Sequence, residues 1–184
     1  MEVGTLSLAH IEAGAPKSKD PNVPHRRIHC VSNPCTLKIN ELVIGVTGTD
    51  AVFHMSADEC NGNLVPGSRL ARISQHMLQQ RSYYPLFPPA PGTNMDLKHM
   101  KQWNMPCQPD LLIVPSKLTS FARPVLQDTV VVNPGQLTKN TTGGTFAIMD
   151  IHPMKRNDLE TAGGDDVELE HSVADRIRLE IRKI

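Results

Sequence analysis

Cysteine and histidine side chains are the groups in this chain that could bind a metal or act as nucleophiles, so their spacing is considered first. The four cysteines, separated by 5, 25 and 47 residues, are Cys30, Cys35, Cys60 and Cys107. Neither the paired C-x2-C motifs of zinc sites nor the regular cysteine framework of a small secreted domain is present. We therefore expect reduced thiols in a cytosolic or nuclear protein.

The histidines are scattered along the chain without an H-x-H pair; they are His10, His25, His29, His54, His76, His99, His152 and His171. We interpret each as a surface group or a hydrogen-bonded core group, because isolated histidines are rarely metal ligands. One alternative is a metal held by His29, Cys30 and Cys35, although flanking a hairpin is the interpretation we favour for these residues. The sequence thus predicts no catalytic residue, no metal site and no cofactor site.

The densest cluster of aromatic and proline residues lies at 80–89, with two Tyr, one Phe and three Pro. It follows a helical pattern and contains no carboxylate, His or Cys, so it is typical of a rigid apolar turn. One role is packing against a sheet, and the other is contact with a partner, since Tyr and Phe are enriched in interface cores. We favour packing, and take as the candidate interface Tyr83, Tyr84, Leu86 and Phe87.

Composition sets limits on the partners. The 184 residues fit one domain, with 39% hydrophobic residues and 19 basic against 19 acidic side chains. Six of the acids lie between Asp158 and Glu170, which leaves a mildly basic remainder. We expect any DNA contact to be weak or indirect. No run of 18 apolar residues occurs, so we expect no membrane span.

Apolar patterns indicate the elements that would position these residues. Alternation over 37–39 and the run at 42–46 predict a hairpin, and Ser68 followed by apolar residues at helical spacing predicts a helix that ends before Pro85. A less certain helix is expected at 95–103. Buried strands are predicted at 111–114 and 129–132, with a short helix at 117–122 between them, and further strands at 145–151 and 177–182.

The strand, helix, strand order favours an α/β fold. We expect a disordered linker at 1–24, a partial domain at 25–154, an acidic disordered insertion at 155–170 and, at 171–184, the C-terminal strand of the same domain.

Several segments together resemble the B subunit family of eukaryotic DNA polymerase alpha. They are VSNPC at 31–35, GVTGTD at 45–50, QRSYYPLFPP at 80–89, PDLLIVPS at 109–116, VNPGQLTK at 132–139 and GGTF at 143–146. The resemblance implies the C-terminal half of a calcineurin-like metallophosphoesterase, a layered β-sandwich flanked by helices. It also implies that the first half of this domain and an OB fold lie outside the sequence.

The resemblance further implies a nuclear, non-catalytic accessory subunit. Such a subunit tethers the C-terminal domain of the polymerase alpha catalytic subunit, and primase indirectly, for initiation of DNA replication. Tyr83 and Tyr84 stand where active relatives carry a metal-binding His, and residues 115–118 replace a late His-containing turn. Two alternatives remain: a residual metal-dependent phosphoesterase or nuclease, which would carry stoichiometric divalent metal, and a DNA-binding module, which would bind in a strongly salt-dependent way.

Overall fold

A five-stranded mixed sheet forms the centre of the molecule. A computed structural model describes residues 30–60, 68–126, 128–155 and 172–184. The sheet order is β1-β2-β3-β5-β4, with strands at Cys35–Ile39 (β1), Leu42–Val46 (β2), Leu111–Ile113 (β3), Thr129–Asn133 (β5) and Phe121–Val125 (β4). β2, β3 and β5 run parallel, whereas β1 and β4 are antiparallel edge strands.

The predicted hairpin and buried strands are confirmed. β1 and β2 pair with Ile39 opposite Leu42, and the turn places Asn40 at φ 53°, a conformation that Asn adopts more readily than most residues. All five residues of β5 are buried, as expected for a strand covered on both faces.

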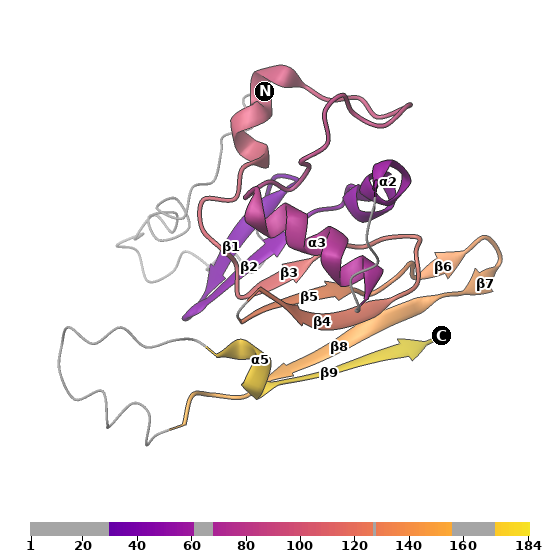
Figure 1. Cartoon of the computed structure of the whole chain (residues 1–184). Helices are drawn as coiled ribbons and strands as arrows, with labels where there is room; N and C mark the ends of the chain where they lie inside the picture. The colour runs from indigo at the N-terminus through magenta and orange to yellow at the C-terminus, as the bar shows by residue number, and fades with distance from the viewer. Residues whose placement is uncertain (1–29, 61–67, 127, 156–171) are drawn as a thin grey trace, which may run out of the picture.

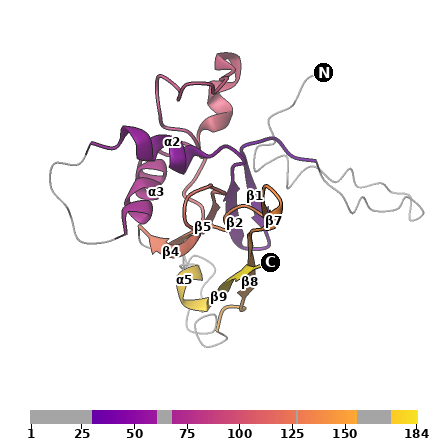
Figure 2. The same ribbon diagram turned by 90° about the vertical axis from the view of Figure 1, so that its right-hand side faces the viewer.

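The remaining elements lie around this sheet. They are α2 (Ala51–Asp58), α3 (Arg69–Gln79), the 3-10 helix η1 (Leu97–Trp103), β6 (Thr138–Lys139), β7 (Thr142–Gly143), β8 (Thr145–Ile151), α5 (Val173–Arg176) and β9 (Ile177–Lys183). Figures 1 and 2 show α2 and α3 on one side of the sheet and the β8–β9 ribbon on the other. The fold is therefore mixed α/β, as predicted, and its layers are consistent with part of a phosphoesterase-like fold.

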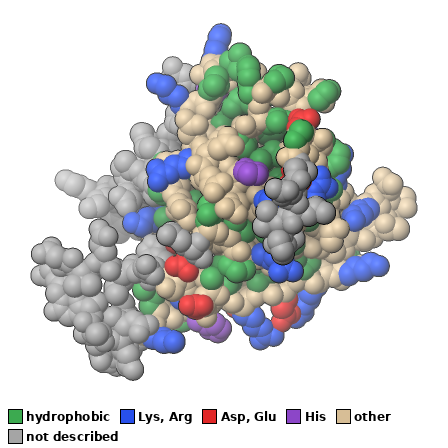
Figure 3. Space-filling model, in the orientation of Figure 1, with side chains coloured by type: hydrophobic (Ala, Val, Ile, Leu, Met, Phe, Trp, Pro, Cys, Tyr) green, Lys and Arg blue, Asp and Glu red, His purple; other side chains and the backbone are tan. Residues whose placement is uncertain are grey.

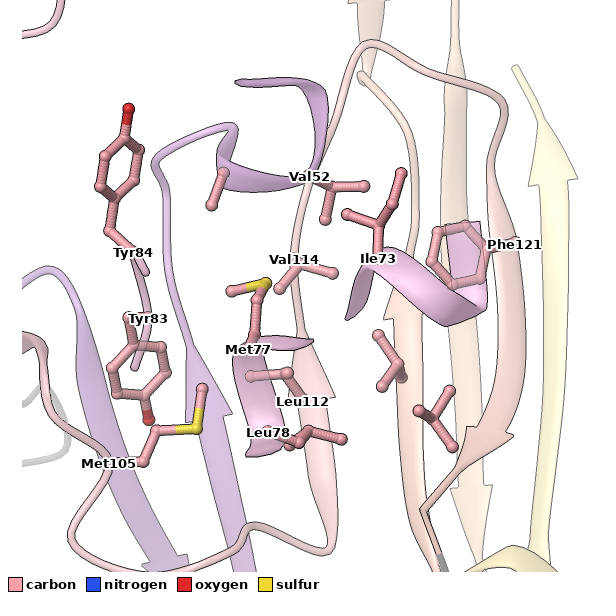
Figure 4. Close-up of a cluster of buried hydrophobic side chains, with 13 residues drawn as sticks. Val52, Ile73, Met77, Leu78, Tyr83, Tyr84, Met105, Leu112, Val114 and Phe121 are labelled. Carbon is pink, nitrogen blue, oxygen red and sulfur yellow. The ribbon is translucent and has the colours of Figure 1, made fainter. Parts of the chain in front are cut away.

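The helical side of the sheet carries the larger apolar core. From α3, Ile73, Met77 and Leu78 pack with Leu112 of β3 (Figure 4). Val131 of β5 belongs to the same cluster. Burial of each such side chain contributes about 1.5–3 kcal/mol. The helix predicted after Ser68 is thus confirmed, and its apolar face is the face that the sequence period indicated.

The β8–β9 ribbon covers the opposite face. β8 pairs with β9 in antiparallel register, with Met149 opposite Leu179 and Ile151 opposite Ile177. Met149, Ile177 and Leu179 pack on the sheet residues Leu111, Val130 and Val132. The period-2 alternation of the C-terminal segment therefore places apolar residues inward and Arg178, Glu180 and Arg182 outward, as predicted.

Three local predictions were wrong or incomplete. Residues 117–122 form no helix: a loop leads into β4, which supplies Phe121 and Val125 to the core beside α3. The edge position of β4 also explains why Pro124 is tolerated there, since an edge strand has a free N–H side. The helix α2 was missed, because its apolar residues show little helical segregation. Residues 97–103 are helical, but as a 3-10 helix.

Ion pairs join the two helices of the covering layer. Glu59, just beyond α2, accepts from Arg69 Nε at 2.7 Å and Arg72 Nε at 2.9 Å. These guanidinium groups lower the pKa of the Glu59 carboxyl. Arg69 and Arg72 therefore hold the start of α3 against the residue that follows α2.

Some expectations concern residues outside those described: the linker at 1–24, and the acidic insertion apart from Lys155. The domain boundaries stay predictions. None of the helices in the described ranges has the length and apolar character needed to cross a bilayer.

Candidate functional site

The carboxyl ends of β2, β3 and β5 meet at one edge of the sheet, the position where α/β folds usually build their sites. Polar residues follow each strand at this edge, namely Thr47, Asp50, Ser116 and Asn133. Their hydrogen bonds show what the edge does.

Asn133, the last residue of β5, is fully buried, and its side chain forms four hydrogen bonds. Its Oδ1 accepts from the backbone N–H groups of Ser116 and Gly135, both at 2.9 Å. Its Nδ2 donates to the carbonyls of Thr119, at 3.2 Å, and Leu118, at 3.4 Å. The amide therefore ties the loop after β3 to the turn after β5, where Gly135 has a positive φ.

Asp50 acts in the same way at the end of β2. One carboxylate oxygen caps α2 by accepting from Phe53 N at 3.0 Å, and the other accepts from Lys117 N at 2.9 Å. The Lys117 ammonium lies 3.5 Å from the centroid of the Phe53 ring, a cation–π contact. The polar groups of this edge thus brace loops against one another, which is a structural role.

Tyr83 packs directly beneath the sheet hairpin. It is 2% exposed, its hydroxyl donates to the carbonyl of Cys35 at 3.0 Å and it lies 2.6 Å from Thr36 Oγ1. Burial raises the pKa of Tyr83 to about 12. A Cβ at Gly45 would lie 2.8 Å from this hydroxyl, so the glycine makes room for the ring.

Tyr84 points the opposite way from the adjacent position, as Figure 4 shows. It is 9% exposed, and its hydroxyl accepts from Ala90 N at 3.1 Å and lies 3.1 Å from His54 Nδ1. The two tyrosines are therefore core residues that hold the 80–89 segment in place. Whether they also contact a partner stays a prediction.

The other two candidate interface residues differ from each other. Leu86 is half-buried against the helical core, whereas Phe87 is 74% exposed. The four predicted residues therefore differ in exposure: Tyr83 and Tyr84 are buried, Leu86 is half-buried and Phe87 is exposed. Whether Phe87 contacts a partner stays a prediction.

The 3-10 helix η1, which the sequence predicted as a helix but not as a neighbour of the aromatic segment, lies against this segment. Tyr83 N donates to Trp103 O and Met105 N donates to Arg81 O, both at 2.7 Å, so the end of η1 is paired with the start of the aromatic segment. Between them lies a hollow of about 360 Å³ lined by Tyr84, Met95 and Trp103, among others. The signal for this element in the sequence was an apolar residue at every third position, namely Leu97, Met100 and Trp103.

The cysteines and histidines do not converge in the described residues. All four cysteines are free thiols, and burial raises the pKa of the Cys35 and Cys107 thiols, which lowers their reactivity. His29, the third member of the alternative metal site, lies outside the described residues. Asp150 and His152 have the D-x-H spacing of metal ligands in phosphoesterases. Both side chains are exposed at the end of β8. Within the described ranges no three His, Cys, Asp or Glu side chains are grouped to hold a metal.

The sequence of this chain is matched by a family of DNA polymerase subunits. The model of the DNA polymerase alpha/epsilon B subunit family matches residues 9–123. The chain belongs to this family.

Individual relatives agree with that assignment. The chain is similar to the B subunit of DNA polymerase alpha from Rattus norvegicus, with 41% identity over 130 residues, which is 70% of this chain and 22% of the relative. The protein of the same name from Schizosaccharomyces pombe is 36% identical over 161 residues, or 84% of this chain and 27% of the relative. The chain therefore spans about a quarter of the length of the curated relatives it matches.

Proposed function

We propose that this chain is a non-catalytic accessory subunit of the DNA polymerase alpha–primase complex. The observation that carries the proposal is its similarity to relatives named as the B subunit of DNA polymerase alpha. The carboxyl edge of the sheet supports a non-catalytic role, because the side chains of Asn133 and Asp50 form hydrogen bonds with backbone groups of neighbouring loops.

The mechanism we propose is burial of apolar surface against another protein, with no bond made or broken. The partner is the C-terminal domain of the catalytic subunit, and primase is joined indirectly. The setting is the nucleus, at the initiation of DNA replication, and any contact with DNA is weak or indirect. In this proposal residues 25–154 and 171–184 act as one partial domain.

Co-expression of the 184-residue chain with the C-terminal domain of the catalytic subunit tests the proposal. Size-exclusion chromatography of the purified mixture should show coelution at one-to-one stoichiometry. A full-length relative of this family serves as the positive control. A Phe87→Ala variant should bind more weakly, because truncating an exposed aromatic anchor removes interface contact without disturbing the core.

The opposite result is equally clear. If the full-length relative binds the catalytic domain and the folded 184-residue chain does not, this part of the family fold does not carry the tethering function. Coelution that is unchanged by Phe87→Ala would support the tethering function and show that Phe87 is not part of the interface.

A further inference from the structure

The strand β9 has one paired edge and one open edge. Among the described residues its neighbour is β8 alone. Figure 1 shows β9 as the outer strand of the ribbon, at the lower margin of the molecule. An open strand edge is a template for pairing with another chain, and many proteins protect such edges with a proline or a bulge. The edge strand β4 contains Pro124, whereas β9 contains neither proline nor glycine.

The register of the ribbon decides which residues of β9 face the open edge. Just beyond one end of the strand, Ile184 N donates to Gly144 O at 3.0 Å. Just before the other end, His152 N donates to Arg176 O at 2.9 Å. Because hydrogen-bonded pairs alternate along an antiparallel ladder, the even-numbered residues of β9 bond to β8. The odd-numbered residues, such as Leu179, therefore direct their N–H and C=O groups to the open edge.

The outward face of β9 carries a row of alternating charges. Glu180 accepts hydrogen bonds from the guanidinium groups of Arg178 and Arg182 in the same strand. The side chains of the two arginines are 69% and 58% exposed, so both are accessible to a partner. Figure 3 shows basic and acidic side chains next to one another along the lower margin of the molecule, where β9 lies.

This charge pattern is complementary to itself when two copies of β9 run antiparallel. If Leu179 lies opposite Leu179 of a second copy, Arg178 lies opposite Glu180 of that copy, and Glu180 lies opposite its Arg178. Both charge pairs fall at non-hydrogen-bonded positions of the new ladder, where Cα atoms are closest, about 4.5 Å apart. Opposite charges at directly facing positions stabilise a sheet.

The neighbouring registers fit less well. With Glu180 on the two-fold axis, arginine faces arginine and glutamate faces glutamate, and such like-charge pairs destabilise a sheet. With Ile181 on the axis the charges match, but the apolar Leu179 faces Lys183. With Leu179 on the axis, Ile181 faces Ile177 on the inner side while the charges match on the outer side.

We propose that two copies of this chain associate through the open edges of β9, antiparallel and with Leu179 on the two-fold axis. The two β8–β9 ribbons then form one four-stranded sheet. Ile181, which is half-buried and belongs to neither core cluster, is covered by Ile177 of the second copy. A different extended segment could share the backbone bonds, but it would need the same charge spacing to match the side chains.

This inference concerns the assembly of the chain with itself and does not depend on the proposed function. Two copies of the chain would bind two catalytic domains, which keeps the one-to-one stoichiometry.

Amide hydrogen exchange of the full 184-residue chain, followed by NMR, reads the open edge directly. The amides of Leu179 and Ile181 should become protected as the protein concentration rises. The amides of Glu180 and Arg182 bond to β8 and should be protected at every concentration. Sedimentation velocity over the same concentrations gives the Kd of the dimer.

Single charge reversals test the register. Arg178→Glu and Glu180→Arg each create two like-charge pairs per dimer, and each should raise Kd at least about tenfold. Arg182→Glu is the matched control, because this arginine is also exposed and also bonds to Glu180. It lies outside the paired residues in the Leu179 register, so its reversal should change Kd by less than about threefold.

Mixing the variants tests whether the charges meet between chains. Fluorescence-detected sedimentation follows a labelled Glu180→Arg chain, and circular dichroism confirms that each variant is folded. Addition of the Arg178→Glu chain should restore dimers of the labelled chain to within about threefold of the wild-type Kd, because every facing charge pair is again of opposite sign. Addition of the Arg182→Glu chain, which has the same net charge, should not, because Arg178 then faces the introduced arginine.

Each contrary result has a distinct meaning. A chain that sediments as a monomer at every concentration overturns the inference and leaves the proposed function standing. A dimer in which the Leu179 and Ile181 amides exchange freely, or that withstands both reversals, uses another surface and also overturns it. Disruption by Arg182→Glu but not by Arg178→Glu would overturn the Leu179 register. Dimers that form without binding the catalytic domain would support this inference and contradict the proposed function.

Discussion

At the scale of single residues, two adjacent tyrosines serve different surroundings. Tyr83 is enclosed beneath β1 and β2, where its hydroxyl meets Thr36 and the carbonyl of Cys35. Tyr84 faces α2 and the loop at Ala90. From residue type alone, both tyrosines were assigned to one apolar cluster. The direction of each ring could not be predicted, because it depends on the path of the backbone between α3 and η1.

The environment of Tyr83 leads to a prediction about its ionisation. The chain has two tyrosines, so in a Tyr84→Phe variant the phenolate absorbance reports Tyr83 alone. Burial raises the pKa of Tyr83, and we expect a titration midpoint of about 12. Because the native pKa lies above the unfolded value of about 10, this group contributes stability that is complete below about pH 10 and is lost as the pH rises through about 12.

Circular dichroism recorded through the same titration is the control for that experiment. A midpoint near the ordinary tyrosine value while the circular dichroism spectrum remains native would show that the Tyr83 phenol is accessible to water. In that case the close packing of its ring against Gly45 would also be wrong.

At the scale of elements, loops at the carboxyl edge are held by side chains rather than by regular structure. The segment between β3 and β4 has no helix, and Asn133 supplies the hydrogen bonds that a helix would have made internally. The expected helix at 117–122 rested on local sequence alone. Phe121 lies in β4 because pairing with Asn133 of β5 and burial beside α3 outweigh local propensity.

Replacing the Asn133 amide should therefore loosen several loops at once. We predict that Asn133→Ala lowers the free energy of unfolding by about 2–4 kcal/mol, because it strands buried backbone N–H and C=O groups. Asn133→Asp should also destabilise, since its second oxygen would face the carbonyls of Leu118 and Thr119. Urea denaturation measures both.

The exposed Asn94 provides the comparison for this substitution. Asn94→Ala should change the free energy of unfolding by no more than about 0.5 kcal/mol. Equal effects of Asn133→Ala and Asn94→Ala would mean that the carboxyl edge is not braced by Asn133.

At the scale of the whole molecule, one sheet joins two apolar cores. The helical side is closed by α2 and α3, and the other side by the β8–β9 ribbon (Figure 1). Tyr83 and Tyr84 complete the helical side. Because neighbouring residues of β3 and β5 point to opposite cores, the two sides share the same strands. Damage to one cover is expected to destabilise the entire unit.

A substitution in the ribbon can test this coupling at a distance. Leu179→Asp places a charge on the inner face of β9 and should lower the free energy of unfolding by about 2–4 kcal/mol. We expect fluorescence of Trp103, on η1, to report the same destabilisation as circular dichroism, because coincident transitions mark a single cooperative unit. Lys183→Asp, at an exposed position of the same strand, should change it by no more than about 0.5 kcal/mol.

If the Trp103 transition keeps its wild-type midpoint while the circular dichroism transition moves, the ribbon unfolds separately. The sheet and the helical layer would then be stable without their second cover.

Periodic segments were the part of the fold that local pattern could predict. The alternation of β9, the apolar runs of β3 and β5 and the apolar face of α3 all follow from side-chain spacing along one element. Ser68 marked the start of α3, although its side chain makes no capping hydrogen bond. For α2 the pattern failed, because Val52, Phe53 and Met55 lie on no single apolar face. The Asp50 cap and tertiary contacts select a helix there.

The sequence by itself determined the family and the α/β class, because motifs and periods are local properties of the chain. Only the tertiary structure decided which members of the 80–89 segment are accessible: Tyr83 and Tyr84 are buried, and Phe87 is exposed. It also decided that Asn133 and Asp50 brace loops and that η1 displays Leu97 and Met100. Exposure and hydrogen-bond partners arise from contacts between distant segments, which no local pattern records.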